Sequence, residues 1–296
     1  MRILITGASS FTGHNVVQSA INEHLDVVGT YRNRNEFTDI LNSLHDAPEL
    51  VQLDLSDLDS FKKLNGKFDS IVHIAAISDF IGASNEALIQ SNILGTNNVI
   101  KYAQKKDINR IVYTSSTSVY GEITSDSICF DTPIFNPSIY GLSKYAGERL
   151  LASVQQDISS VSLRLPGVLG RGASRSFIPL IGKKLLADQP VTIFNEQTAF
   201  NNVIHVNDLS RLIFQILEYT SWNGFHAFPV AADNPMPMIE LTTKMKTMLG
   251  SSSDIIKIDS DKQSFVIDSQ YATNNFGYNP RSTWNSIREY FQDIQN

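Results

Sequence analysis

The stretch Ile139-Tyr140-Gly141-Leu142-Ser143-Lys144 places a phenol and an amine four residues apart. On a helix such residues share one face, so Tyr140 and Lys144 are expected to be neighbours. A free phenol titrates near pH ~10, and lowering its pKa to about 7 requires roughly 4 kcal/mol of selective stabilisation of the phenolate. An ammonium about 4 Å away supplies about that much at an effective dielectric constant of about 20. The pair can serve as an acid–base catalyst, although chance places this spacing in about every second chain of such composition.

A glycine-rich segment near the N-terminus offers a second kind of chemistry. Thr6-Gly7-Ala8-Ser9-Ser10-Phe11-Thr12-Gly13 directly follows an apolar run and precedes a helical stretch that starts at His14. Gly7 allows a tight turn, Gly13 allows helix and strand to approach closely, and a helix N-terminus presents N–H groups to a pyrophosphate. The segment predicts a dinucleotide site, with a plain turn as the alternative.

Both motifs need a scaffold, and the pattern along the chain predicts one. Short apolar runs predict strands at Ile3–Thr6, Asp26–Tyr31, Leu50–Leu53, Ser70–Ala75 and Arg110–Ser115. Helical patterns lie between or after them at Val16–Glu23, Leu58–Leu64, Ala87–Lys105 and Tyr140–Val154. This alternation predicts an α/β fold with a doubly wound parallel sheet that helices cover on both faces.

Composition argues against several classes of partner. The formal net charge is −6, and basic residues cluster no further than pairs such as Lys105-Lys106, so we expect no nucleic acid partner. The single cysteine, Cys129, excludes an internal disulfide, and the six histidines lack the close spacing of metal ligands. No stretch approaches the ~20 apolar residues of a membrane helix. We expect a soluble cytoplasmic protein with no membrane partner and no metal.

The motifs together resemble the extended branch of the short-chain dehydrogenase/reductase family, which is NAD-dependent epimerase/dehydratase-like. Its glycine signature runs Thr-Gly-x-x-Gly-x-x-Gly, and Ser10 replaces the middle glycine. Further similar segments follow in family order at Asp54-Leu55, His73–Ala76, Asn92–Asn97, Tyr113–Gly121 and Pro137–Tyr140. The resemblance covers most of the chain and implies an NAD(P)-dependent enzyme.

The resemblance implies three catalytic residues. Tyr140 exchanges the hydroxyl proton, Lys144 holds the ribose and lowers the tyrosine pKa, and Ser116 hydrogen-bonds the reacting oxygen. Reduction of a carbonyl leaves negative charge on oxygen, which needs such donors within about 3 Å. The residues expected around the cofactor are Gly7, Ser9, Ser10, Phe11, Thr12, Gly13, Arg32, Asp54, Leu55, Ala75, Ala76, Asn92, Lys144, Pro166 and Val168.

The end of the second predicted strand bears on the choice of cofactor. It reads Gly29-Thr30-Tyr31-Arg32-Asn33-Arg34. An acidic side chain there would bond a ribose 2′-hydroxyl, whereas a guanidinium grips a 2′-phosphate. Because two arginines and no carboxylate occur, we predict NADP(H), with solvated arginines and NAD(H) as the alternative.

Beyond Leu165 the alternation loosens and prolines punctuate short elements. We predict a Rossmann dinucleotide-binding domain at 1–165, to which 198–228 returns. A smaller C-terminal substrate-binding lobe is predicted at 166–197 and 229–296. A cleft between the two is where a small molecule is expected.

Parts of this lobe resemble nucleotide-sugar epimerases, dehydratases and reductases, at Ser176–Pro179, Gln189–Phe194 and Val203–Asp208. Asn201-Asn202 stands where those enzymes usually carry an arginine, which puts a bidentate diphosphate contact in doubt. Arg171 and Arg175 could compensate, or could be solvated surface charges.

Three functions remain open on the sequence. The favoured one is an NADP(H)-dependent reductase or dehydrogenase acting on a carbonyl/alcohol pair of a keto-sugar nucleotide by a Ser-Tyr-Lys mechanism. The second is an NAD-dependent nucleotide-sugar 4-epimerase, and the third is a non-catalytic protein that senses the dinucleotide. The resemblance also implies a homodimer through the helices at Ala87–Lys105 and Tyr140–Val154.

Overall fold

The computed structural model describes residues 1–78, 82–219, 221–261 and 264–295. Its contacts divide the chain into two compact units. The first contains Met1–Gly121, Pro133–Arg164 and Leu209–Phe228, and the second contains Glu122–Thr132, Leu165–Asp208 and Pro229–Asn296.

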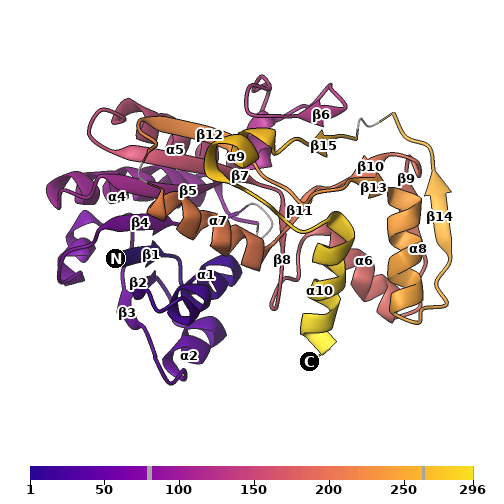
Figure 1. The fold of residues 1–296 in the computed structure, drawn as a ribbon, viewed down its shortest axis with the longest axis horizontal. Coiled ribbons are helices and arrows are strands. Elements are labelled where there is room, and N and C mark those ends of the chain that lie inside the picture. Colours follow the sequence, from indigo (N-terminus) through magenta and orange to yellow (C-terminus); the bar gives the residue numbers. More distant parts are fainter. Residues whose placement is uncertain (79–81, 220, 262–263, 296) are drawn as a thin grey trace. The chain divides into compact units, whose positions relative to one another are not determined.

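A seven-stranded sheet forms the centre of the first unit (Figure 1). Its strands are β1 (Arg2–Thr6), β2 (Asp26–Tyr31), β3 (Glu49–Gln52), β4 (Ser70–His73), β5 (Arg110–Ser116), β7 (Ser159–Leu165) and β12 (Phe225–Pro229). They lie in the order β12-β7-β5-β4-β1-β2-β3, and β1–β2, β1–β4, β2–β3 and β4–β5 pair in parallel. The predicted doubly wound fold is confirmed. The strand order reverses between β1 and β4, and ligands of such sheets bind at the carboxyl ends of the strands there.

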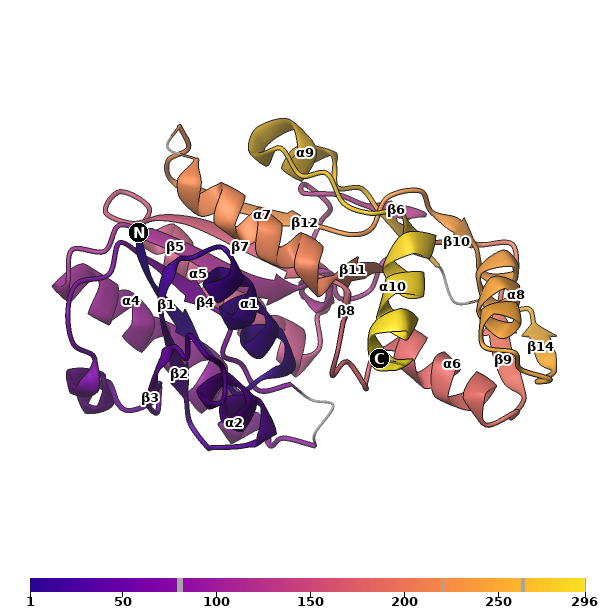
Figure 2. The same ribbon diagram turned by 60° about the horizontal axis from the view of Figure 1, so that its bottom comes forward.

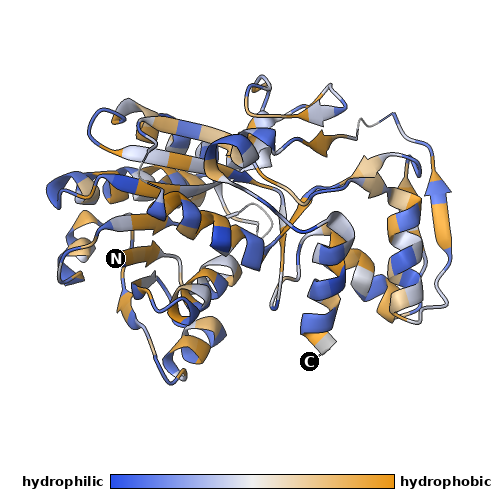
Figure 3. Ribbon diagram, viewed as in Figure 1, coloured by the Kyte–Doolittle hydropathy of each residue, from blue (hydrophilic) through white to orange (hydrophobic). Residues whose placement is uncertain are grey.

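Helices cover both faces of this sheet (Figure 2). They are α1 (Phe11–Asn22), α2 (Glu36–Asn42), α4 (Gly95–Lys105), α5 (Ile139–Ser153) and α7 (Val206–Glu218), with short 3-10 helices η1 (Leu58–Lys63) and η4 (Thr117–Tyr120). In Figure 2, α1 and α7 lie on one face and α4 and α5 on the other. Leu4, Ile71 and Ile111 of the strands pack with Val99 and Tyr102 of α4. Hydrophobic and hydrophilic residues mix along α7, as expected of a helix with one face on the sheet (Figure 3).

Some predicted elements of this unit differ from the observed ones. The predicted helix Ala87–Lys105 is three segments, α3 (Asn85–Leu88), a π-helical turn η3 (Ile89–Leu94) and α4. The predicted helix Leu58–Leu64 is the 3-10 helix η1, and the helix predicted at Val16–Glu23 begins earlier, at Phe11. The sequence analysis missed α2, which is only seven residues long.

Small sheets and helices make up the second unit. Its strands are β6 (Ser127–Ile128), β8 (Gly167–Leu169), β9 (Val191–Phe194), β10 (Ala199–Phe200), β11 (Val203–His205), β13 (Met236–Pro237), β14 (Ile255–Ile258) and β15 (Val266–Ile267). Its helices are α6 (Phe177–Leu186), α8 (Met238–Met248), α9 (Gln270–Phe276) and α10 (Thr283–Gln295). Buried Leu169, Ile178, Leu241 and Phe291 belong to its core.

The unit boundaries differ from the predicted domains at two places. Segment 122–132 joins the second unit because β6 pairs with β15, and segment 198–208 joins it because β11 pairs with β8. Across the described residues, no helix has the length and apolar character needed to cross a bilayer.

Candidate active site

The glycine-rich turn joins β1 to α1 and is sterically closed to side chains at two positions. Gly7 has φ +86°, and a Cβ on it would lie 2.8 Å from the Cα and N of Ala75. A Cβ on Gly13 would lie 2.0 Å from the carbonyl oxygen of Gly7. Both glycines are therefore required by the turn itself. Three predicted site residues, Gly7, Gly13 and Ala75, meet at this place.

Ser10 occupies the position of the family's middle glycine and caps α1. Its Oγ donates to the carbonyl oxygen of Gly7 at 2.8 Å and accepts from the N–H of Gly13 at 3.0 Å. Its backbone is extended, with φ −94° and ψ 157°, so this position does not need the left-handed freedom of glycine. Helix α1 therefore begins at Phe11, and the N–H groups of Phe11 and Thr12 belong to its first turn.

The loop after β2 lies against this turn. The amide of Asn35 donates to the carbonyl oxygen of Ser9 at 2.8 Å. Arg34 pairs with Asp39, with Nε 2.6 Å from Oδ1, whereas the Nη1 of Arg32 lies 3.4 Å from the Oγ of Ser91, an uncharged partner. Since the Arg34 guanidinium already has a carboxylate partner, Arg32 is the better candidate for binding a 2′-phosphate.

Asp54 and Leu55 lie in the loop that follows β3. The Oδ1 of Asp54 accepts from the N–H and the hydroxyl of Ser56, at 2.9 and 2.7 Å. The amide of Asn98 on α4 donates to the carbonyl oxygen of Leu55 at 2.9 Å, which holds the loop against that helix. Asp54 is exposed, two residues beyond the end of β3. A contact of either residue with the adenine end of a cofactor stays a prediction.

A buried polar network lies at the ends of β1 and β4. His73 contacts the hydroxyl of Thr6 through Nδ1 at 2.7 Å and that of Thr96 through Nε2 at 2.9 Å. The same Thr6 oxygen accepts from the N–H groups of Ile74 and Ala75, at 3.2 Å each. Burial, aided by the charge of Lys144, lowers the pKa of His73 to about 3, so the imidazole is neutral. The network fixes the backbone that runs into Ala75 and Ala76.

Asn92 lies within the π-helical turn, where its buried side chain is fully engaged. Its Oδ1 accepts from the N–H of Ile77 at 2.8 Å, and its Nδ2 donates to the carbonyl oxygen of Ile77 and to the Oγ of Ser143, at 2.9 Å each. Ser143 in turn donates to the carbonyl oxygen of Tyr140 at 2.7 Å. Asn92 thus ties the segment after Ala76 to the start of α5, and a direct cofactor contact stays a prediction.

Two glycines let α5 lie close to the elements that carry Ser116. A Cβ on Gly141 would lie 2.1 Å from the carbonyl oxygen of Ser118 in η4, and a Cβ on Gly147 would lie 2.6 Å from the Oη of Tyr113 in β5. Ser116 ends β5 and caps η4, accepting from the N–H of Ser118 at 3.1 Å. The structure therefore packs the helix of Tyr140 and Lys144 directly on the segment that bears the predicted serine.

Lys144 is a buried lysine with only 2% of its surface exposed. Its Nζ lies 4.2 Å from the centroid of the Tyr113 ring. Burial lowers the pKa of Lys144 to about 7, and the charge of Glu148, one turn further along α5, opposes that change. Tyr140, one turn before Lys144, is half-buried. Such a lysine can change protonation state near neutral pH and can influence a phenol beside it.

Glu148 also belongs to a buried ion pair that the sequence analysis missed. Its carboxylate accepts from Nε and Nη2 of Arg164, at 3.1 and 2.8 Å, and from the Oγ of Ser115 at 2.6 Å. Burial works against the charge of Arg164, but bonding and attraction to Glu148 outweigh it and raise its pKa. Because Ser115 is bound in this way, Ser116 remains the candidate for the substrate oxygen. The signals in the sequence were a glutamate four residues after Lys144 and an arginine within an apolar strand.

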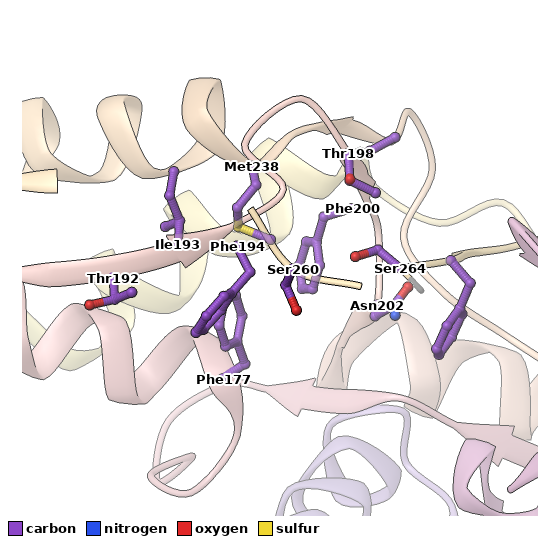
Figure 4. A pocket seen from close by; sticks show the side chains of 12 residues that line it. Phe177, Thr192, Ile193, Phe194, Thr198, Phe200, Asn202, Met238, Ser260 and Ser264 are labelled. Atoms are coloured by element: carbon purple, nitrogen blue, oxygen red, sulfur yellow. The ribbon is translucent and has the colours of Figure 1, made fainter. Parts of the chain in front are cut away.

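The second unit contains an aromatic pocket of about 390 Å³ (Figure 4). It is lined by Phe177, Thr192, Ile193, Phe194, Thr198, Ala199, Phe200, Asn202, Met238, Ser260, Ser264 and Phe265. The rings of Phe177 and Phe200 lie 5.6 Å apart at 46°. Among the described atoms, no partner lies within hydrogen-bonding reach of the buried Oδ1 of Asn202. The aromatic lining suits a planar ring.

Pro166 and Val168 also belong to the second unit, Val168 within β8. Their predicted role at the cofactor stays a prediction. In the described part of the chain, no three His, Cys, Asp or Glu side chains come together as metal ligands would.

Known proteins resemble this chain in sequence and in fold. The sequence profile of the NAD dependent epimerase/dehydratase family matches residues 3–227, more than half of the chain. The chain belongs to this family. It is an NAD(P)-dependent enzyme of the extended short-chain dehydrogenase/reductase type, as the sequence analysis predicted.

Two curated relatives match much of this chain in sequence. A putative UDP-glucose 4-epimerase of Methanocaldococcus jannaschii is 29% identical over 227 residues, which cover 73% of each chain. A dTDP-glucose 4,6-dehydratase of Mycobacterium tuberculosis is 28% identical over 237 residues, covering 74% of this chain and 69% of that one.

Solved structures share the fold over the whole chain. The UDP-glucuronic acid 4-epimerase from Bacillus cereus, solved with NAD, has a TM-score of 0.83 at 23% identity, covering 100% of this chain and 99% of that chain. The UDP-Glc/GlcNAc 4-epimerase from Campylobacter jejuni has a TM-score of 0.84 at 21% identity with the same coverage. At such identities the likeness establishes the fold of this epimerase/dehydratase family member, not its substrate.

Proposed function

We propose that the protein is an NADP(H)-dependent oxidoreductase acting on a carbonyl/alcohol pair of a keto-sugar nucleotide. The observation that carries this proposal is the placement of Tyr140 and buried Lys144 one turn apart on α5, packed through Gly141 and Gly147 against the segment of Ser116. When bound, the dinucleotide supplies or accepts the hydride.

Side chains of the protein transfer the hydroxyl proton and stabilise the charge that the transfer leaves. In the direction of reduction, Tyr140 gives its hydroxyl proton to the substrate oxygen, while Ser116 donates a hydrogen bond to the same oxygen. The resulting phenolate is stabilised by the ammonium of Lys144. In the direction of oxidation the same groups act in reverse, so that Tyr140 takes the proton.

The turn between β1 and α1 fits a dinucleotide. A Cβ on Gly7 or Gly13 would collide with backbone, and the N-terminus of α1 opens at the same place, as a pyrophosphate requires. Arg32 favours NADP(H), since its guanidinium is exposed at the end of β2. NAD(H) is the alternative, because the Bacillus cereus relative was solved with NAD.

The aromatic pocket supports a nucleotide as part of the substrate. Its phenylalanine rings offer stacking surfaces to a base. Relatives whose names include UDP-glucose and dTDP-glucose favour such a base.

A 4-epimerase is the second candidate, because several relatives carry that name and the reaction needs the same three side chains. One assay separates the candidates. The purified protein is incubated with NADPH and a panel of keto-sugar nucleotides and simple ketones, with absorbance and products followed together. Net loss of NADPH with formation of an alcohol supports the oxidoreductase. Interconversion of sugar nucleotides without net loss supports the epimerase, and no reaction with any substrate supports a dinucleotide-sensing protein.

We also propose a homodimer formed through α4 and α5. Ile139 and Leu142 of α5 are 48% and 49% exposed, as expected of apolar side chains that a second copy would cover. Sedimentation of the purified protein tests this, and a monomer at micromolar concentration would contradict it.

A further inference from the structure

Tyr113 is a fully buried aromatic residue of β5 to which the proposed reaction gives no role. Its ring centroid lies 4.2 Å from the Nζ of Lys144 and 5.3 Å from the ring of His73. A Cβ on Gly147 would lie 2.6 Å from its hydroxyl oxygen, so α5 presses closely on the ring. The ring is therefore held between the neutral His73 on one strand and the helix that carries Lys144.

Side chains from α5, β4 and β5 surround Lys144. Glu148 and Tyr140 flank it along α5, one turn to either side, and the carboxylate of Glu148 is paired with Arg164. His73 on β4 is buried and uncharged. From β5, the face of Tyr113 is the contact with the ammonium. A cation over an aromatic face gains most when both are removed from water, as they are here.

We propose that Tyr113 is a positioning residue for Lys144, whose ring face holds the buried lysine in its ammonium form on the side of α5 that carries Tyr140. The effect on turnover rests on the proposed function. The effect on the protonation of Lys144 does not, because it depends only on contacts within the folded chain.

The ring, and not the hydroxyl, is the active part in this proposal. Tyr113→Phe keeps the ring face and removes the oxygen, whereas Tyr113→Leu removes the face. The protonation of Lys144 is measured by NMR titration of the full-length protein labelled with ¹³C at the lysine ε-carbons. The Lys144 signal is assigned by its absence in Lys144→Met.

The proposal predicts an unchanged midpoint in Tyr113→Phe and a midpoint lower by about one pH unit, or about tenfold in acidity, in Tyr113→Leu. The direction follows because the ring stabilises only the charged amine. If the leucine variant does not fold, Tyr113→Met replaces it, since methionine fills irregular space without an aromatic face. A folded variant without the ring that titrates as the wild type would overturn the proposal, as would an equal shift in Tyr113→Phe.

Turnover gives a second readout. If the wild type is active, the limb on which its rate falls with rising pH should move to lower pH in Tyr113→Leu, by the shift seen for Lys144. A purely structural role would lower the amount of folded enzyme without moving that limb. If the wild type binds the dinucleotide but converts no substrate, the proposed function fails while the NMR titration still decides the role of Tyr113.

Discussion

Ser10 shows how one side chain can take the place of a glycine in a glycine-rich turn between a strand and a helix. Its hydroxyl caps α1 through the N–H of Gly13. Ser10→Ala removes the cap and should lower the free energy of unfolding by about 1 kcal/mol, whereas Ser10→Gly should lower it by only a few tenths of that. Urea denaturation of the two variants measures the difference. A Ser10→Ala variant as stable as the wild type would show that the hydroxyl does not stabilise the helix.

His73 should make the protein sensitive to acid. The folded pKa of His73, about 3, lies below the ordinary histidine value of 6.5, so its stabilising contribution is complete above about pH 6.5 and is lost as the pH falls toward 3. The glutamine of His73→Gln cannot be protonated. In this variant the unfolding free energy should therefore fall less steeply with decreasing pH in this window, by up to about 1.4 kcal/mol per pH unit. Denaturation curves at successive pH values test this, with His45→Gln as the exposed control. A slope unchanged from the wild type would contradict it.

Arg32 and Arg34 should contribute unequally to cofactor choice. Arg34 is already paired with Asp39, whereas the contact of Arg32 with Ser91 is long, at 3.4 Å. Arg32→Ala should weaken NADPH binding about tenfold or more and leave NADH binding nearly unchanged, since only NADPH carries the 2′-phosphate. Arg34→Ala is the matched control, with a smaller loss. Fluorescence titration with both cofactors measures this, and tighter binding of NADH by the wild type would refute the assignment.

At the level of elements, the ion pair of Glu148 and Arg164 joins α5 to β7, while Ser115 attaches β5 to the same carboxylate. Glu148→Gln leaves a buried arginine without its counter-charge and should lower the unfolding free energy by about 3–5 kcal/mol. The double variant Glu148→Leu with Arg164→Met removes both charges and should recover most of that loss. Chemical denaturation compares the three proteins. A double variant less stable than Glu148→Gln would contradict this account.

The sequence predicted elements where local pattern governs them and failed where distant contacts do. Strands β1, β2 and β5 are short apolar runs and were found within one or two residues. The π-helical turn could not be foreseen, because Asn92 bonds to Ile77 and Ser143, which are distant in sequence. Likewise Tyr140 and Lys144 stand out by spacing, but Tyr113 lies against Lys144 only once the fold brings β5 and α5 together.

For the whole molecule, family and fold are established while the substrate is not. The predicted domains differ from the compact units at 122–132 and 198–208, because two-residue and three-residue strands such as β6 and β11 leave almost no periodic pattern. The aromatic pocket was also missed, since its rings come from separate segments. Fold alone does not select a substrate, so the function has to be tested at the catalytic residues.

The most direct test compares turnover of the wild type and Tyr140→Phe with NADPH and the best substrate of the panel. Phenylalanine keeps the ring but cannot give or take the proton, so the rate should fall by about a hundredfold or more, with NADPH binding retained. Circular dichroism checks that both proteins are folded. Unchanged turnover in the folded variant would contradict the assignment of Tyr140 as the proton donor and acceptor.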